Sequence, residues 1–394
     1  MTLTSFQTVA LAALVVYFGR YLKSRISFIE KYNLPSPVIG GFVVAIVISL
    51  LKSQGLFEIQ FNKAFEESLM IAFFASVGYS ASLRLLKEGG RAVIFFLLLT
   101  ICGLVLQIAA GIGAAQLMGL HPLMGVLTGA VSLTGGPGTA LAFGPSFESA
   151  GVEGASAIGL TTAMGGIVLG GLVGTPLATY LINKRRLKEA PLAASQQHED
   201  SHFLRSFPGR DLLLHILALV LIMGIGTTLS SWISSLKITL PIYIGSMIIA
   251  AVVRNIEDVK PVFKIKPEWI EEIGNVALTL FIAMAIMSLR LEELRNAALP
   301  IIVFLVMQAV LVAVTAIGPA FWVAGKDYEA SVMSAGYVGF MMGTTANAMA
   351  NMSSLAQRYG PAPKAFLVIP LVGSCFIDFF NAALVTFCLN LFGG

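Results

Sequence analysis

Long apolar segments, separated by short polar loops, run through the whole of this chain. Ten of them approach the length of roughly 20 residues that a helix needs to cross the hydrocarbon core of a bilayer. They occupy residues 4–22, 35–52, 67–84, 92–118, 156–183, 211–230, 241–253, 272–289, 297–324 and 364–391. The pattern predicts an all-α, polytopic membrane protein.

Two further apolar segments, at about residues 123–146 and 329–351, are shorter and interrupted. The first contains Gly135-Gly136-Pro137-Gly138, which would weaken a continuous helix by roughly 6 kcal/mol, at ~1 for each Gly and ~3 for Pro. Broken backbone at membrane depth is tolerated only where protein buries it or where it lines a watery cavity. We therefore expect two re-entrant hairpins in addition to the ten crossings.

The composition excludes an ordinary soluble domain. Hydrophobic residues make up 57% of the 394 residues and charged residues only 12%, whereas a soluble domain has about 25% charged residues. The basic residues occur in loops and form no stripe among aromatic residues, so the sequence predicts no nucleic-acid partner. The lipid bilayer is the expected environment.

The positions of the basic residues predict the orientation. With the amino terminus outside, and with each hairpin returning to the side it enters from, the inside receives all but five of the 25 Lys and Arg residues. The five exceptions are Lys52, Lys63, Lys237, Arg290 and Arg295. This agrees with the positive-inside rule, and it places both termini outside. Residues 184–210, the only long polar segment, then form a cytoplasmic linker with a disordered middle.

The linker separates two halves, residues 1–183 and 211–394, that resemble each other. A shift of 206 positions, without a gap, superposes several short motifs, among them a Leu-Pro pair, the tetrapeptide Ser-Leu-Arg-Leu and the two broken stretches. The matched positions are Leu34-Pro35 with Leu240-Pro241, 82–85 with 288–291, and Thr139-Ala140 with Thr345-Ala346. Because each half has five crossings, an odd number, the second half is expected to be inverted. Inverted repeats with discontinuous segments near the midplane are typical of secondary transporters.

The hairpin tips carry the first group of candidate binding residues. They are Thr134, Gly135, Gly136, Gly138 and Thr139 in the first hairpin, and Gly343, Thr344, Thr345 and Asn347 in the second. Amides at the start of a helix attract carboxylates, while loop carbonyls and threonine hydroxyls suit Na⁺, for which Thr345 is one candidate. Alternatively, these glycines serve only to let helices pack closely.

Asp378 is the only carboxylate deep inside a predicted crossing, where a charge is costly and suggests a function. Asn381 lies three positions further, on the same helix face. Asp378 is a candidate ligand of Na⁺ or partner of a substrate ammonium, with a structural hydrogen bond as the alternative. Asn275, Gln107 and Gln308 are expected to be buried amides. Of the three, Asn275 is the best candidate for the site, as a Na⁺ ligand, and the other two are expected to join helices.

These residues lie in motifs that resemble the bacterial glutamate:Na⁺ symporter family. The motifs are 32–41 (YNLPSPVIGG), 69–78 (LMIAFFASVG), 122–139 (PLMGVLTGAVSLTGGPGT), 274–288 (GNVALTLFIAMAIMS) and 347–381, which includes ANAMANM, AFLVIPLVG and FIDFFNA. The resemblance implies a homodimer in the bacterial cytoplasmic membrane that imports glutamate with Na⁺, without a further cofactor, by an elevator-like movement. It also implies that both hairpins hold substrate and Na⁺, with Asp378 and Asn381 beside them.

This chain departs from the family pattern at two places. Pro137 stands where the first hairpin commonly has histidine, and the second hairpin lacks the proline expected after its threonine. A Na⁺-coupled symporter of di- or tricarboxylates therefore stays an alternative. A channel with opposed re-entrant loops is a further one, although the two tips differ in sequence. An enzyme is not expected, because there is no GxSxG motif, no histidine deep in a crossing and no second Asp at membrane depth.

Overall fold

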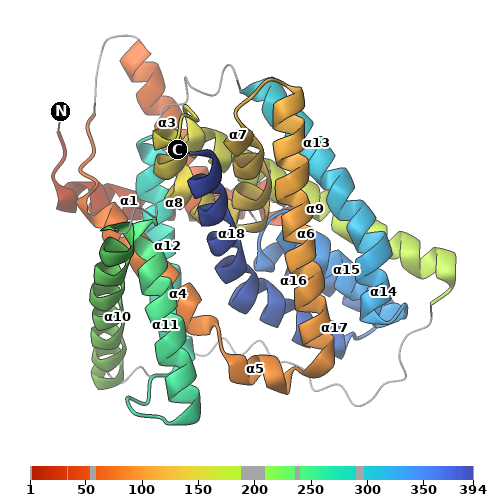
Figure 1. Cartoon of the computed structure of the whole chain (residues 1–394). Coiled ribbons are helices and arrows are strands. Elements are labelled where there is room, and N and C mark those ends of the chain that lie inside the picture. Colours follow the sequence, from red (N-terminus) through yellow and green to blue (C-terminus); the bar gives the residue numbers. More distant parts are fainter. Residues whose placement is uncertain are drawn as a thin grey trace.

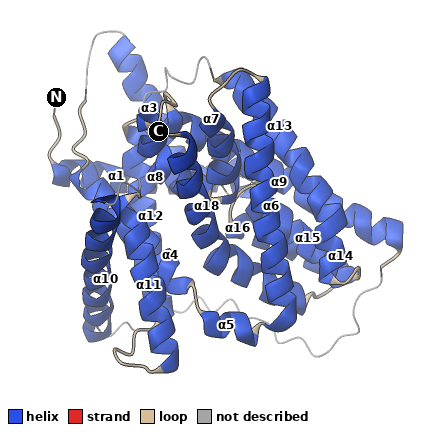
Figure 2. Ribbon diagram, in the orientation of Figure 1, coloured by secondary structure: helices blue, strands red, loops and turns tan. Residues whose placement is uncertain are grey.

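The computed structural model describes residues 2–32, 34–53, 59–187, 209–235, 240–289 and 297–393. In these residues the regular structure is helical apart from one isolated bridge between Thr2 and Gln60 (Figure 2). Eight helical runs among them are long and apolar enough to cross a bilayer, so the prediction of an all-α, multi-pass membrane protein is confirmed. Most of the predicted linker, from 188 to 208, lies outside the described residues.

The first half consists of α1 (Ser5–Arg25), α2 (Ser27–Lys31), α3 (Ser36–Ser53), α4 (Ala64–Ser80), α5 (Leu83–Glu88), α6 (Gly90–Leu117), α7 (Pro122–Val126), the π-helical η1 (Leu127–Thr134), α8 (Gly136–Ser149) and α9 (Ala155–Arg185). The second half consists of α10 (Gly209–Ser235), α11 (Ile242–Val259), α12 (Pro267–Met287), α13 (Ala298–Thr315), η3 (Ala316–Ala320), α14 (Phe321–Ala324), α15 (Tyr328–Met341), α16 (Thr345–Tyr359), α17 (Pro363–Pro370), η4 (Leu371–Phe376) and α18 (Ile377–Phe392).

The helix boundaries repeat with the offset of 206 residues. Residues 36–53 of α3 become 242–259, which are the bounds of α11, and Pro122 at the start of α7 becomes Tyr328 at the start of α15. The single helix α9 corresponds to the run α17–η4–α18, which Pro370 interrupts. Proline removes an intrahelical hydrogen bond, so the helix shifts into a π-helical segment at that point.

Two of the ten predicted crossings are not among the eight long apolar helices. These are α3 and α11, which have 18 residues each. The last turns of α11 carry Arg254, Glu257 and Asp258, which lower its apolar content. α3 packs against α1 and α12, and α11 packs against α10 and α4.

The helices form two bundles (Figure 1). The six-helix bundle contains α1, α3, α4, α10, α11 and α12. The hairpin bundle contains the remaining long helices, the two interrupted segments and α18. Aromatic side chains fill part of the contact between the bundles, because Tyr243 of α11 stacks on Phe74 of α4 and also meets Phe143 of α8 edge-on. This contact is therefore apolar.

The arms of the interrupted segments are too short to cross a membrane alone. α8 and α15 have 14 residues each and α16 has 15, and at about 1.5 Å per residue each is shorter than the roughly 30 Å hydrocarbon core. α15 and α16 pack side by side. α16 ends at Tyr359, beyond the predicted limit of 351. The prediction followed the apolar residues, whereas the last turns of α16 are helical but polar.

Side-chain caps mark where two of these helices begin. Asp327 accepts a hydrogen bond from the Ala330 amide at 2.7 Å at the start of α15, and Thr344 accepts one from the Asn347 amide at 3.3 Å at the start of α16. Such caps satisfy amides that have no partner inside the helix. The second interrupted segment is therefore a pair of separate helices with defined starts.

Candidate functional site

The first interrupted segment contains a kink and a break. Within η1, Gly129 has the non-helical angles φ −102° and ψ −106°. A Cβ at this position would lie only 2.8 Å from Nε2 of Gln308, so glycine allows α13 to approach the kink. Nδ2 of Asn381 in α18 donates a hydrogen bond to the Ala130 carbonyl at 3.0 Å. The kink is thus held by helices of the second half.

The break itself lies at the predicted glycines. η1 ends at Thr134 and α8 begins at Gly136, whose φ of +71° lies in the left-handed region that favours glycine. Pro137 follows in the first turn of α8, where its missing N–H and fixed φ are tolerated. Pro137 therefore starts a helix, and the amides of Gly138 and Thr139 follow in the same turn.

The tips of the two interrupted segments touch. A Cβ built on Gly136 would lie 3.2 Å from the Gly343 carbonyl oxygen and 3.4 Å from Cγ2 of Thr344. Since α8 begins at Gly136 and α16 begins at Thr345, the amino ends of two helices meet at this point. Each carries about half a positive elementary charge together with unpaired amides. The meeting point is suited to an anion.

Gln107 of α6 joins the two tips. Its Oε1 accepts a hydrogen bond from the Thr134 hydroxyl at 2.6 Å, and its Nε2 donates to the Met341 carbonyl at 2.9 Å. Nε2 of Gln308 donates in turn to the Gln107 main-chain carbonyl at 2.9 Å. Both amides are fully buried, as expected for residues that join helices. The sequence identified them as buried polar groups but gave no sign that one of them binds both hairpins.

Glycines of α9 hold the second hairpin. Gly166 faces the Met342 carbonyl, Gly170 faces Nδ2 of Asn347, and the next glycine in this four-residue spacing, Gly174, faces the Asn351 amide. Asn347 donates from Nδ2 to the Ile167 carbonyl at 3.0 Å. Small residues allow this close approach.

The interrupted run α17–η4–α18 lies beside the second tip. A Cβ at Gly373 of η4 would lie 3.3 Å from Oγ1 of Thr345. Asp378 lies in the first turn of α18 and is partly buried, and Asn381 is 1% exposed. Oδ1 of Asn381 is a buried oxygen with no hydrogen-bond partner among the described residues. It is therefore available to a ligand at the kink.

Asn275 differs from the other candidates because it is exposed, not buried as the sequence suggested. Its helix α12 still reaches the first tip, since Leu278, one turn further, lies 2.8 Å from the position of a Cβ on Gly138. The apolar surroundings of Asn275 in the sequence do not reveal which face of α12 it occupies. The candidates at the tips thus come together, Asn381 lies at the kink, and Asn275 lies on the six-helix bundle.

The charges around the tips are unusual in one respect. The sequence has no Lys or Arg in residues 92–183, 327–357 or 365–394, which include both tips and α18. An anion at the tips would therefore be bound by helix amino ends, amides, hydroxyls and bound cations. Asp378 is the acidic group of α18, the helix whose Asn381 binds the first segment at the Ala130 carbonyl.

The comparisons with known proteins agree on one family. The model of the sodium/glutamate symporter family matches residues 1–361. The chain is 36% identical over 395 residues to the sodium/glutamate symporter of Escherichia coli (strain K12), which covers 99% of this chain and 98% of that protein. It is 35% identical over 390 residues to the sodium/glutamate symporter of Haemophilus influenzae (strain ATCC 51907 / DSM 11121 / KW20 / Rd), covering 98% and 96%.

Proposed function

Because this chain belongs to the sodium/glutamate symporter family, we propose that its two hairpin tips bind glutamate and Na⁺ and carry them together into the cell. The protein is a multi-pass membrane transporter and not an enzyme, and Na⁺ is its coupled ion. The observation that carries the proposal for the site is the contact between Gly136 and the Gly343 carbonyl, which brings two helix amino ends together.

The chemistry of the tips suits glutamate. The amino ends of α8 and α16 bind its carboxylates, with hydroxyls of Thr139 and Thr345 nearby. Asp378 neutralises the substrate ammonium or binds Na⁺, and the unpaired Oδ1 of Asn381 is a further oxygen ligand for Na⁺. Thr345 at the start of α16 is another proposed Na⁺ ligand, whereas Asn275 stays a sequence-based candidate because its exposed position on α12 does not bring it to the tips.

The two halves form inverted repeats in this proposal. The 206-residue offset of the helix boundaries supports a duplication, and five crossings per half turn the second copy over. The amino terminus and carboxyl terminus then lie outside, the linker lies in the cytoplasm, and the membrane is the bacterial cytoplasmic membrane. The short arms of α8, α15 and α16 support hairpins that enter and leave on the same side.

Transport occurs by an elevator-like movement of the hairpin bundle against the six-helix bundle. The aromatic contact through Phe74, Phe143 and Tyr243 supports this, because among the described residues these rings meet without a hydrogen bond from the Tyr243 hydroxyl and can slide at little cost. A homodimer keeps the six-helix bundle fixed in the membrane. The large exposed apolar residues of α10, among them Leu217, Leu221 and Trp232, provide a face for lipid or for a second copy.

Reconstitution in proteoliposomes tests the proposal. We expect a Na⁺ gradient to drive accumulation of labelled glutamate above its external concentration, and a K⁺ gradient of the same size to drive none. Flux without accumulation, and independent of Na⁺, would instead indicate a channel. A panel of citrate, malate, aspartate and glutamate as competitors decides the substrate, and competition by citrate or malate alone would contradict glutamate transport.

A further inference from the structure

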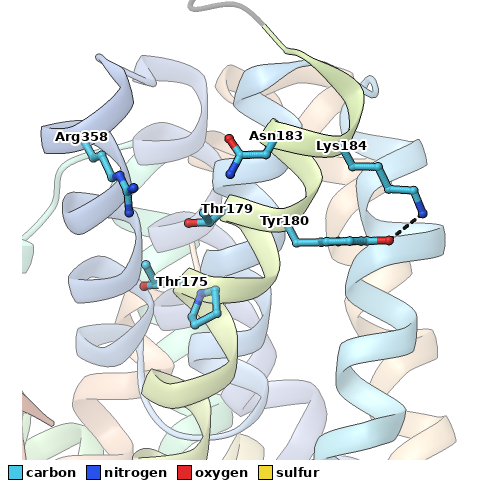
Figure 3. Close-up of a pocket in the computed structure, with 7 residues that line it drawn as sticks. Thr175, Thr179, Tyr180, Asn183, Lys184 and Arg358 are labelled. Atoms are coloured by element: carbon cyan, nitrogen blue, oxygen red, sulfur yellow. Dashed lines mark hydrogen bonds between the residues drawn. The ribbon is translucent and has the colours of Figure 1, made fainter.

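A cavity lies away from the hairpin tips, between the carboxyl-terminal parts of α9 and α16. It has a volume of about 690 Å³, and its lining is Thr175, Pro176, Thr179, Tyr180, Asn183, Lys184 and Arg358 (Figure 3). In the proposed orientation both helix ends lie at the cytoplasmic face, near Arg185, Lys326 and Lys364. The cavity is large enough for a small organic acid.

Arg358 supplies the available positive charge of this cavity. Its side chain is exposed, lies 5.2 Å from the Tyr359 ring centroid, and has no ion pair with any described carboxylate. Lys184 is engaged elsewhere, since its Nζ donates to the Tyr180 hydroxyl at 2.6 Å and turns to the opposite side of α9 in Figure 3. The guanidinium of an arginine fits a carboxylate through two parallel hydrogen bonds.

Neutral polar groups on α9 face the same side as Arg358. Thr175, Thr179 and Asn183 recur every four residues, and Figure 3 shows all three directed from one face of α9 toward the helix that carries Arg358. Hydroxyl and amide groups complement a charged carboxylate at little desolvation cost, because the cavity is open to solvent. Together with the guanidinium they form a site for an anion.

A polar line connects this cavity with the second tip. On α16, Asn347 at the tip is followed by Asn351 one turn later and by Arg358 two turns after that. The Thr175 hydroxyl, which lines the cavity, donates to Oδ1 of Asn351 at 3.3 Å. The 11 residues from Asn347 to Arg358 correspond to about 16 Å along the helix. The cavity therefore lies at one end of the α9–α16 contact, and the second tip lies at the other.

We propose that this cavity is a second, weak carboxylate site, with Arg358, Asn183 and Thr179 as its ligands, which the substrate occupies on its way between the hairpin tips and the cytoplasm. The inference rests on the proposed function, because it takes the transported acid as the ligand. The shared chemistry, an anionic group, would also fit the phosphate of a lipid headgroup. The connection through Thr175 and Asn351 favours the transported acid.

The test measures glutamate uptake by the variant Arg358→Gln separately from each face of the membrane. Na⁺-driven glutamate uptake is measured in right-side-out membrane vesicles, which expose the outer face, and in everted vesicles, which expose the cytoplasmic face. We expect the KM to rise about tenfold in everted vesicles and by less than about twofold in right-side-out vesicles, since a charge-assisted hydrogen bond is lost on one face only. An unchanged KM on the cytoplasmic face would overturn the proposal.

Matched variants separate the site from general damage. Lys184→Gln removes a neighbouring charge that Tyr180 already engages, and it should leave both KM values unchanged. Arg358→Lys should keep most of the cytoplasmic affinity, and Thr179→Val should raise the cytoplasmic KM without altering the net charge. An equal rise on both faces, or the same effect in Lys184→Gln, would overturn the proposal as well.

Two further results distinguish the alternatives. In liposomes of phosphatidylcholine alone, whose headgroup has no net charge, glutamate exchange by Arg358→Gln should stay impaired; recovery of exchange in the absence of anionic lipid would assign the site to an anionic lipid headgroup and refute our inference. Absence of Na⁺-dependent glutamate uptake by the unmodified protein, in either vesicle type, would refute the proposed function itself and with it this site.

Discussion

The contact between the two tips can be tested by adding one methyl group. In Gly136→Ala the new Cβ would lie 3.2 Å from the Gly343 carbonyl oxygen, which is closer than normal packing allows, so the tips must separate by a few tenths of an ångström. Alanine at a φ of +71° also costs roughly 1–2 kcal/mol of folding stability. The substitution therefore combines a backbone cost with a displacement of the proposed binding groups.

Gly119→Ala is the matched control. Gly119 has nearly the same φ, +67°, but a Cβ there meets nothing within 4 Å. Both variants should lose similar stability, measured as thermal unfolding of the detergent-solubilised protein. The difference between them isolates the contact between the tips.

The assay is the KM for glutamate in Na⁺-driven uptake by proteoliposomes. We expect Gly136→Ala to raise the KM about three- to tenfold, equivalent to about 0.7–1.4 kcal/mol of binding free energy, because the amino ends of α8 and α16 no longer converge on one anion. Gly119→Ala should keep the KM of the unmodified protein. Equal KM values for the two variants would refute the idea that the tips form one binding site.

Three other perturbations test the remaining parts. Gln107→Leu should lower the free energy of unfolding by about 1–3 kcal/mol, because it leaves buried groups unpaired. Thr134→Val should then cost less stability in the Gln107→Leu variant than in the unmodified protein, since the bond between the two side chains is already lost; additive losses would argue against the network. Asp378→Asn should abolish or strongly weaken Na⁺-driven uptake, whereas near-normal uptake with unchanged Na⁺ dependence would remove Asp378 from the site. Single cysteines in place of Glu153, in the loop after α8, and Gln357, exposed in the last turn of α16, should react with impermeant thiol reagents from opposite faces, and labelling from the same face would contradict the inverted topology.

Much of the fold could be predicted because it depends on local properties. The apolar runs predicted the long helices, and the 206-residue register anticipated that α3 and α11 have matching bounds. The glycines at 135–138 predicted where a helix must end, since their backbone cost is intrinsic to the residues. The family followed from motifs spread through the chain, and the comparisons confirm it.

The contacts within the site could not be predicted in the same way. Gln107 binds a carbonyl 234 residues away, and hydropathy gives the burial of a side chain but not its partner. For the same reason the sequence placed Asn275 among the buried amides, although it lies on an exposed face of α12. The hydropathy pattern missed the end of α16, because Gln357 and Arg358 are polar. The helical structure of α16 depends on its packing against α9 and α17, which hydropathy does not report.

The hydrogen bond from Asn381 to Ala130 has a consequence for biosynthesis. The two residues are 251 positions apart, so the kinked first hairpin leaves the ribosome long before its donor is made. At about 5–20 residues per second the delay is roughly 10–50 s. During this interval the Ala130 carbonyl keeps its local hydrogen bond from the Gly135 amide, at 3.0 Å, but lacks the second donor from α18. The kink of the first segment therefore lacks its tether to α18 until the chain is nearly finished, and a nascent chain truncated before α18 should be a substrate for membrane proteases.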